Sequence, residues 1–148
     1  MLSWSSGKDS AWALGVLRGR EDIDLVGLFT TVNEEFKRVA MHAVRLELLQ
    51  AQAAALDLPL KVIYIPFPCT NEAYEACMRR FVDEIKADGI EAVAFGDLFL
   101  EDVRKYREEN MKGTGIDTIF PIWGLNTTEL SRAMVTTMGE MPGCRHGY

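Results

Sequence analysis

The clearest candidate for chemistry is a six-residue loop of small and charged residues, Ser5-Ser6-Gly7-Lys8-Asp9-Ser10. It follows a short apolar run at residues 2–4 and precedes a helical pattern over residues 10–19. The first N–H groups of a helix lack partners within the helix, and the helix dipole adds partial positive charge there. Small side chains let an anion approach the backbone, and Lys8 adds a full charge. The loop therefore predicts a phosphate site, although an ordinary Ser or Asp helix cap would give a similar pattern.

Five apolar or β-branched runs alternate with helical patterns and would position this loop. The expected strands are residues 2–4, 25–31, 60–65, 91–95 and 116–122. The expected helices are residues 10–19, 38–56, 72–87, 101–111 and 129–138. Such alternation predicts βαβ units, and thus an α/β, Rossmann-like fold with an open parallel five-stranded sheet and helices on both faces.

Details of two of the helices can also be predicted. The helix over 38–56 is expected to bury a stripe with helical spacing, namely Met41, Val44, Leu48, Ala51 and Ala55. Thr70 or Asn71 could cap the helix over 72–87, and Gly89 is placed to end it. Cys77, inside that helix, is interpreted as a packing residue.

Composition bounds the class of protein. The chain has 148 residues, of which 48% are hydrophobic and 26% charged, which indicates one soluble globular domain. A net charge of −6 argues against a broad nucleic-acid surface. No apolar run approaches the roughly 20 residues that span a membrane. Three cysteines without C-x-x-C spacing, Cys69, Cys77 and Cys144, indicate reduced thiols, so we expect a cytoplasmic protein.

Ligands of open α/β sheets bind beyond the carboxyl ends of the strands, and this rule selects the candidate residues. After the fourth expected strand, Gly96 permits close backbone approach and Asp97 could hold a metal or a hydroxyl. Glu101, Arg104 and Glu108 share a helix face, either as structural ion pairs or as a functional surface.

Three further residues leave alternatives open. His42 could be an exposed surface residue or could face a pocket. Cys69, at a strand end, could be a reactive thiol, but a small apolar loop residue is the preferred interpretation. Trp123 is interpreted as core cover rather than as a stacking platform.

The loop resembles the S-G-G-x-D-S motif of the PP-loop pyrophosphatase superfamily, with Ser6 at the first glycine. A serine here is expected to be tolerated with a negative φ. The chain is similar to the diphthine–ammonia ligase family in four segments, SSGKDSAWAL, TTVNEEFKRVAMHAVRLELLQAQAAAL, FGDLFLEDVRKYRE and FPIWGLNT. The similarity extends to about residue 138, which gives a PP-loop ATP-binding domain over 1–138 and an irregular tail over 139–148. The family's C-G-E-x-G-E-x-H-T-like motif is not found, so the chain resembles a bacterial relative that is short at the C-terminus.

The resemblance implies an adenine nucleotide alpha hydrolase-type domain that uses ATP and Mg²⁺, in a reaction like that of diphthamide synthesis. A carboxylate would be adenylated with release of pyrophosphate, and ammonia would displace AMP to form an amide. ATP would be bound by the loop and four further residues: Ser5, Ser6, Gly7, Lys8, Asp9, Ser10, Thr30, His42, Gly96 and Asp97. Lys8, Asp9 and Asp97 would be catalytic, with Asp9 also on the metal. Glu101, Arg104 and Tyr106 would contact the substrate.

Two alternatives remain beside the ligase. The first is an adenylating enzyme similar to tRNA sulfurtransferases, with Cys69 carrying the sulfur. The second is a nucleotide-binding module without turnover. The acidic composition and the lack of a C-x-x-C pair weigh against the first. A homodimer is left open.

Overall fold

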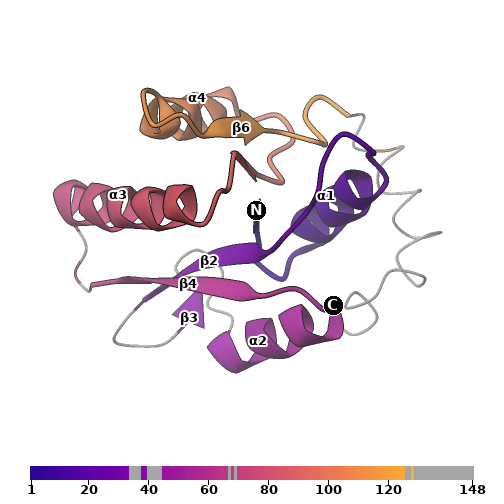
Figure 1. Cartoon of the computed structure of the whole chain (residues 1–148), viewed down its shortest axis with the longest axis horizontal. Coiled ribbons are helices and arrows are strands. Elements are labelled where there is room, and N and C mark those ends of the chain that lie inside the picture. Colours follow the sequence, from indigo (N-terminus) through magenta and orange to yellow (C-terminus); the bar gives the residue numbers. More distant parts are fainter. Residues whose placement is uncertain (34–37, 40–44, 67, 69, 126–127, 129–148) are drawn as a thin grey trace.

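The computed structural model describes residues 1–33, 38–39, 45–66, 68, 70–125 and 128. Ten elements lie within this part of the chain (Figure 1). The strands are β1 (Leu2–Ser3), β2 (Leu28–Asn33), β3 (Arg38–Val39), β4 (Leu60–Ile65), β5 (Ala92–Ala94) and β6 (Asp117–Ile119). The helices are α1 (Lys8–Arg18), α2 (Leu46–Ala55), α3 (Asn71–Ala87) and α4 (Glu101–Met111). The predicted helix over 129–138 and the tail over 139–148 lie outside the described residues.

Five strands form the parallel sheet that the sequence predicts, in the order β4-β2-β1-β5-β6. β2 pairs along its whole length with β4, from Leu28↔Leu60 to Asn33↔Ile65. The opposite edge of β2 pairs first with β1 and then, antiparallel, with the short strand β3. The α/β, Rossmann-like fold is confirmed, and β3 is an addition to it.

The helix predicted over 38–56 is wrong in its first part. Residues 38–39 form β3, because their ladder with Val32 and Asn33 of β2 holds the backbone extended. α2 begins only at Leu46. Its predicted stripe is also wrong, since Leu48, Ala51 and Ala55 are exposed, while the buried face consists of Leu46, Leu49, Gln52 and Ala53. Most positions of α2 are Leu or Ala, so more than one apolar stripe fits the sequence. Met41 and Val44 lie outside the described residues.

The second strand starts later than the predicted run over 25–31. β2 begins at Leu28, opposite Leu60, the first residue of β4. Pro59 has no N–H to donate, but its carbonyl oxygen accepts a hydrogen bond from Leu28 N–H at 2.9 Å. The partner strand therefore sets where β2 begins.

Helices cover both faces of the sheet (Figure 1). On one face, Leu14 and Leu17 of α1 and Leu49 of α2 pack in one core with Leu2 and Leu28. We call this cluster the α1/α2 core. On the other face lies the α3/α4 core, which contains Phe29, Phe81, Ile85, Val93 and Met111. Neighbouring strand residues such as Leu28 and Phe29 alternate between the two cores, as side chains on a pleated strand must.

The ends of α3 confirm two sequence predictions. Thr70 is the N-cap, and its Oγ1 accepts a hydrogen bond from Ala73 N–H at 3.1 Å. Gly89 follows the C-cap with φ of +80°, a conformation that glycine adopts without strain. Cys77 is partly buried and packs against the α3/α4 core, which confirms its packing role.

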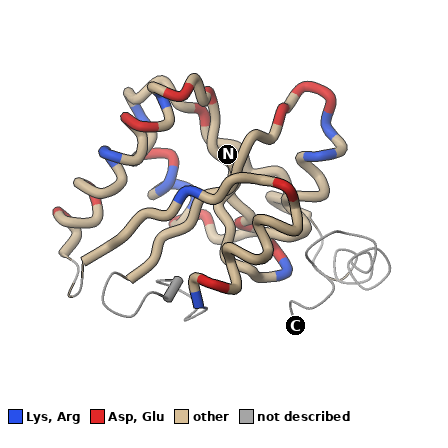
Figure 2. Tube along the Cα trace, turned by 60° about the horizontal axis from the view of Figure 1, so that its bottom comes forward, with Lys and Arg blue, Asp and Glu red and all other residues tan. Residues whose placement is uncertain are grey.

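Within the described residues, no helix is both long and apolar enough to cross a membrane. Figure 2 shows acidic and basic residues interspersed along α3 and α4 instead of gathered by sign.

Candidate functional site

The loop after β1 leads into an N-terminus of α1 that no side chain caps. Gly7 is the N-cap, with extended backbone angles (φ −82°, ψ 166°) and no side-chain hydrogen bond to the first turn. The helical ladder begins where Ala11 N–H donates to the Gly7 oxygen at 3.2 Å. The alternative of an ordinary Ser or Asp cap is therefore wrong. The first turn of α1 directs backbone N–H groups toward the carboxyl edge of the sheet, as an anion site requires.

Ser6 has a φ of +69°, so the condition under which the sequence predicted a serine to be tolerated, a negative φ, is not met. This is the left-handed region, where a Cβ crowds the following carbonyl. The geometry explains why the PP-loop motif that this loop resembles has glycine at this position. In this chain the serine must be held in the strained conformation by its surroundings.

Gln52 of α2 contacts the loop of residues 5–10 through Ser6. Its Nε2 donates to Ser6 Oγ at 3.0 Å, and its Oε1 accepts from Trp4 Nε1 at 2.9 Å. Gln52 is only 8% exposed. Sequence reasoning missed this residue. Gln52 shares a helix face with Leu49, Ala53 and Leu56, but the sequence of α2 fits other apolar stripes equally well, so spacing alone does not select it.

The two outer serines of the loop are turned toward each other. Ser10 is buried, and its hydroxyl donates to the Gly7 oxygen at 3.0 Å. Ser5 Oγ lies 3.4 Å from Ser10 Oγ. These bonds tie the start of the loop to the first turn of α1.

Lys8 and Asp9 lie at the surface of the same turn. Lys8 Nζ contacts Asp9 Oδ1 at 2.8 Å, with side chains 58% and 39% exposed. Among the described residues, no group of three or more His, Cys, Asp or Glu side chains is arranged to hold a metal ion. The predicted metal ligand Asp9 is therefore a single accessible carboxylate beside the uncapped turn.

Gly96, just beyond β5, lies directly against this turn. A Cβ added to Gly96 would lie 3.1 Å from Asp9 C, Asp9 O and Ser10 N. The structure thus brings the second strand end to the loop, as the sequence predicts. Thr30 is buried in β2, one residue beyond the partner of Ser3 in the β1–β2 ladder. It therefore lies beside the start of the loop.

Asp97 is paired with α4. Its Oδ2 accepts a hydrogen bond from Arg107 Nε at 2.6 Å, and the two side chains are 18% and 30% exposed. The Arg107 guanidinium also stacks over Phe95, 4.3 Å from the ring centroid. Arg107 lies three residues after Arg104, and the sequence predicts that the two share a helix face.

Arg104 is held by aromatic rings at the end of β6. Its guanidinium lies 4.6 Å from the Phe120 centroid and 4.9 Å from that of Trp123, and its Nε pairs with Glu108 at 3.0 Å. The Trp123 ring therefore packs against the Arg104 guanidinium. From sequence it was interpreted as core cover or as a stacking platform, and this contact combines parts of both. Glu101 is exposed in the first turn of α4.

Tyr106 has different neighbours from Arg104. Its ring stacks on Tyr74 of α3, with centroids 6.4 Å apart. The structure therefore does not group Tyr106 with the aromatic residues around Arg104. His42 and Cys69 lie outside the described residues.

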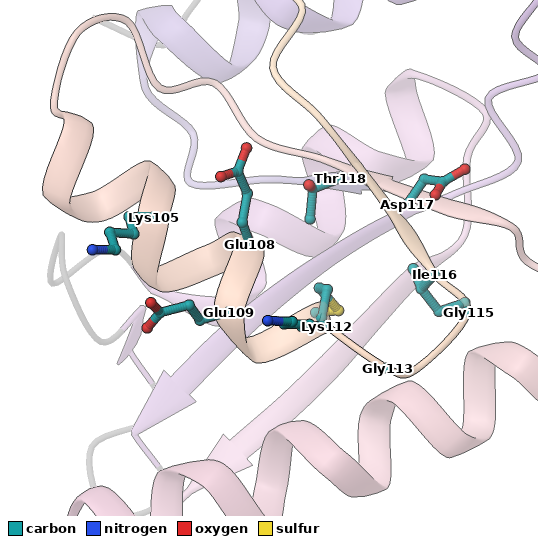
Figure 3. A pocket seen from close by; sticks show the side chains of 10 residues that line it. Lys105, Glu108, Glu109, Lys112, Gly113, Gly115, Ile116, Asp117 and Thr118 are labelled. Carbon is teal, nitrogen blue, oxygen red and sulfur yellow. The ribbon is translucent and has the colours of Figure 1, made fainter.

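A separate cavity of about 560 Å³ lies between the C-terminal half of α4 and β6 (Figure 3). Lys105, Glu108, Lys112 and Thr118 are among its lining residues. The connection from α4 to β6, residues 112–116, forms part of its wall. This connection lies at the amino edge of the sheet, so the cavity is distinct from the loop of residues 5–10.

A parallel sheet whose first strand leads through a small-residue loop into an uncapped helix defines a Rossmann-like domain of the PP-loop type. A family model described as the diphthamide synthase N-terminal domain matches residues 1–118, and the chain belongs to this family. The match runs from β1 into β6 and includes the loop of residues 5–10, Gly96 and the whole of α4. The family indicates an ATP-utilising enzyme. The comparison with curated proteins finds no match.

Proposed function

We propose that the chain binds Mg²⁺–ATP at residues 5–10 and is an amide ligase that adenylates a carboxylate and releases pyrophosphate. The observation that carries the proposal is the uncapped first turn of α1 with the Gly96 backbone packed against it. Any side chain at residue 96 would press on the backbone of this turn. The family match supports the use of ATP.

The residues of the loop fit a polyphosphate. Backbone N–H groups and Lys8 would neutralise the β- and γ-phosphates, which leave together as pyrophosphate. Mg²⁺ commonly uses one or two carboxylates plus phosphate oxygens, and Asp9 offers such a carboxylate. Catalysis would then come mainly from positioning the two reactants and from stabilising charge on the leaving group.

Arg104 supports a carboxylate acceptor. Its guanidinium lies against the rings of Phe120 and Trp123, and the planar guanidinium matches the geometry of a carboxylate. Glu108 already occupies one side of it, so a substrate carboxylate would compete with or replace this ion pair. Glu101 and Tyr106 remain predicted substrate contacts, and Asp97 a predicted catalytic residue.

The reaction products test this proposal. Incubation with Mg²⁺–ATP, ammonium and a set of candidate carboxylates is expected to release AMP and pyrophosphate, measured by chromatography. Release of ADP and phosphate would contradict the proposal. Calorimetric binding of Mg²⁺–ATP with no turnover on any carboxylate would instead support a nucleotide-binding module.

Asp9→Asn tests the metal contact. We expect Mg²⁺–ATP binding to weaken by about tenfold or more, the effect typical of losing a group that supports a metal site. Asp22→Asn is the matched control, because Asp22 forms a similar exposed pair with Arg20 at 2.7 Å, away from the loop. Unchanged calorimetric affinity in Asp9→Asn would show that Asp9 does not hold the metal.

A further inference from the structure

Trp4, Gln52 and Ser6 form a short chain of hydrogen bonds that joins α2 to the loop, buried at Trp4 and partly buried at Ser6. An indole N–H can only donate, so the oxygen of the Gln52 amide must face Trp4. The amide nitrogen must then face Ser6. Trp4 thereby fixes the orientation of the amide, which could otherwise be turned either way.

This orientation determines the role of the Ser6 hydroxyl. Because Gln52 Nε2 donates the bond, Ser6 Oγ is the acceptor, and its own hydrogen is left for another acceptor. A phosphate oxygen is such an acceptor. The same bond anchors the side chain of a residue whose φ of +69° is unfavourable for serine.

We propose that Gln52 is a positioning residue that holds Ser6 in the left-handed conformation and so shapes the loop for phosphate. The inference rests on the proposed binding of Mg²⁺–ATP at residues 5–10. Gln52 does not itself contact the ligand in this scheme. It acts through the backbone conformation of Ser6, whose φ is +69°.

A double-mutant cycle between positions 52 and 6 tests the proposal. Gln52→Met keeps the approximate size of the side chain but removes both hydrogen bonds. We expect it to weaken the calorimetric affinity for Mg²⁺–ATP by about tenfold. This corresponds to the free energy that one non-glycine residue costs in the left-handed conformation. Ser6→Gly adopts the conformation without help, so it should restore most of the affinity when added to Gln52→Met.

The melting temperature separates positioning from a general loss of fold. Gln52→Met leaves the buried Trp4 N–H unpaired, and Ser6→Gly does not repair that bond. The double variant should therefore regain affinity while its melting temperature stays low. Gln50→Met is the matched control, because Gln50 is exposed two residues earlier on α2 and should change neither property.

Gln52→Glu provides an independent variant if Gln52→Met does not fold. Its carboxylate can still accept from Trp4 but cannot donate to Ser6, and it places negative charge beside the phosphate site. Its affinity should fall, and Ser6→Gly should restore it only in part, because the added charge remains.

Three results of the binding measurements would contradict one or both proposals. Absence of Mg²⁺–ATP binding by the unaltered chain would overturn the proposed function. Binding by the unaltered chain that Gln52→Met leaves at the level of Gln50→Met would overturn the positioning role alone. Weakened binding that Ser6→Gly does not restore in Gln52→Met would also overturn it, because Gln52 would then act only through the general fold.

Discussion

At the scale of single residues, Ser6 and Gly96 fix the shape of the candidate site. Ser6 adopts a left-handed conformation, and Gly96 packs against the backbone of Asp9 and Ser10. The sequence could nominate both, since one stands where the PP-loop motif has glycine and the other ends a predicted strand. Gln52 could not be found in the same way, because its role depends on how α2 packs beneath the loop.

Gly96→Ala is expected to lower both stability and affinity. The new Cβ would lie 3.1 Å from backbone atoms of Asp9 and Ser10, which cannot rotate away as a side chain can. We expect the free energy of unfolding to fall by about 1–3 kcal/mol, as overpacked sites typically show. Urea unfolding and Mg²⁺–ATP titration measure the two effects.

Gly19→Ala is the matched control at the other end of α1. A Cβ there would meet carbonyl oxygens at 3.5 and 3.6 Å, which is ordinary contact, and the φ of Gly19 is −81°. This variant should leave affinity unchanged. Equal behaviour of the two alanine variants would show that the close approach at Gly96 has no energetic importance.

At the scale of elements, prediction from sequence succeeded where one segment determines its own structure. α4 and β4 have the predicted bounds, because charged residues define the helix and prolines bracket the strand. Prediction failed where another segment of the chain determines the structure. The start of β2 depends on Pro59, and residues 38–39 are extended because they pair with β2. Likewise, the uniform Leu and Ala content of α2 leaves the choice of buried face to packing.

Thr70→Ala is expected to destabilise α3 through the loss of its cap. Thr70 Oγ1 accepts a hydrogen bond from Ala73 N–H at 3.1 Å. Replacing such a cap by alanine typically lowers the free energy of unfolding by about 1 kcal/mol. Thr70→Ser keeps the hydroxyl and should stay close to the unaltered chain in urea unfolding.

Asn71→Ala controls for changes at the same helix end. Asn71 is exposed in the first turn and is not the N-cap. If Thr70→Ser proved as unstable as Thr70→Ala, the methyl packing of Thr70 and not its hydrogen bond would carry the effect.

At the scale of the whole molecule, the sheet separates two hydrophobic cores. Leu17 belongs to the α1/α2 core and Ile85 to the α3/α4 core. α1, which begins at the loop, packs in the first core, whereas α4, which carries Arg104 and Arg107, covers the opposite face. The candidate site therefore draws its parts from both layers and depends on the sheet to align them.

Substitutions in the two cores should act independently on stability. Leu17→Ala is expected to lower the free energy of unfolding by about 2–5 kcal/mol and Ile85→Val by about 0.5–1.5 kcal/mol. Combined, their effects should add to within about 0.5 kcal/mol, because the two side chains belong to separate clusters on opposite faces of the sheet. Urea denaturation of the single and double variants measures this.

The control pair lies within one core. Phe81 and Ile85 are four residues apart on the buried face of α3, so Phe81→Leu with Ile85→Val should depart from additivity. A larger departure for Leu17 with Ile85 than for this pair would contradict the separation of the cores.

The tryptophans have a practical consequence for work with this protein. Trp4 is bonded to Gln52 beside the loop, Trp12 of α1 packs against the α1/α2 core, and the Trp123 ring lies against the Arg104 guanidinium. In the described part of the chain, Trp12 Nε1 is buried without a hydrogen-bond partner. Indole emission responds to its electrostatic and hydrogen-bonding surroundings, so the chain carries an intrinsic optical reporter. A fluorescence titration would follow events at the loop and around Arg104 without any attached label.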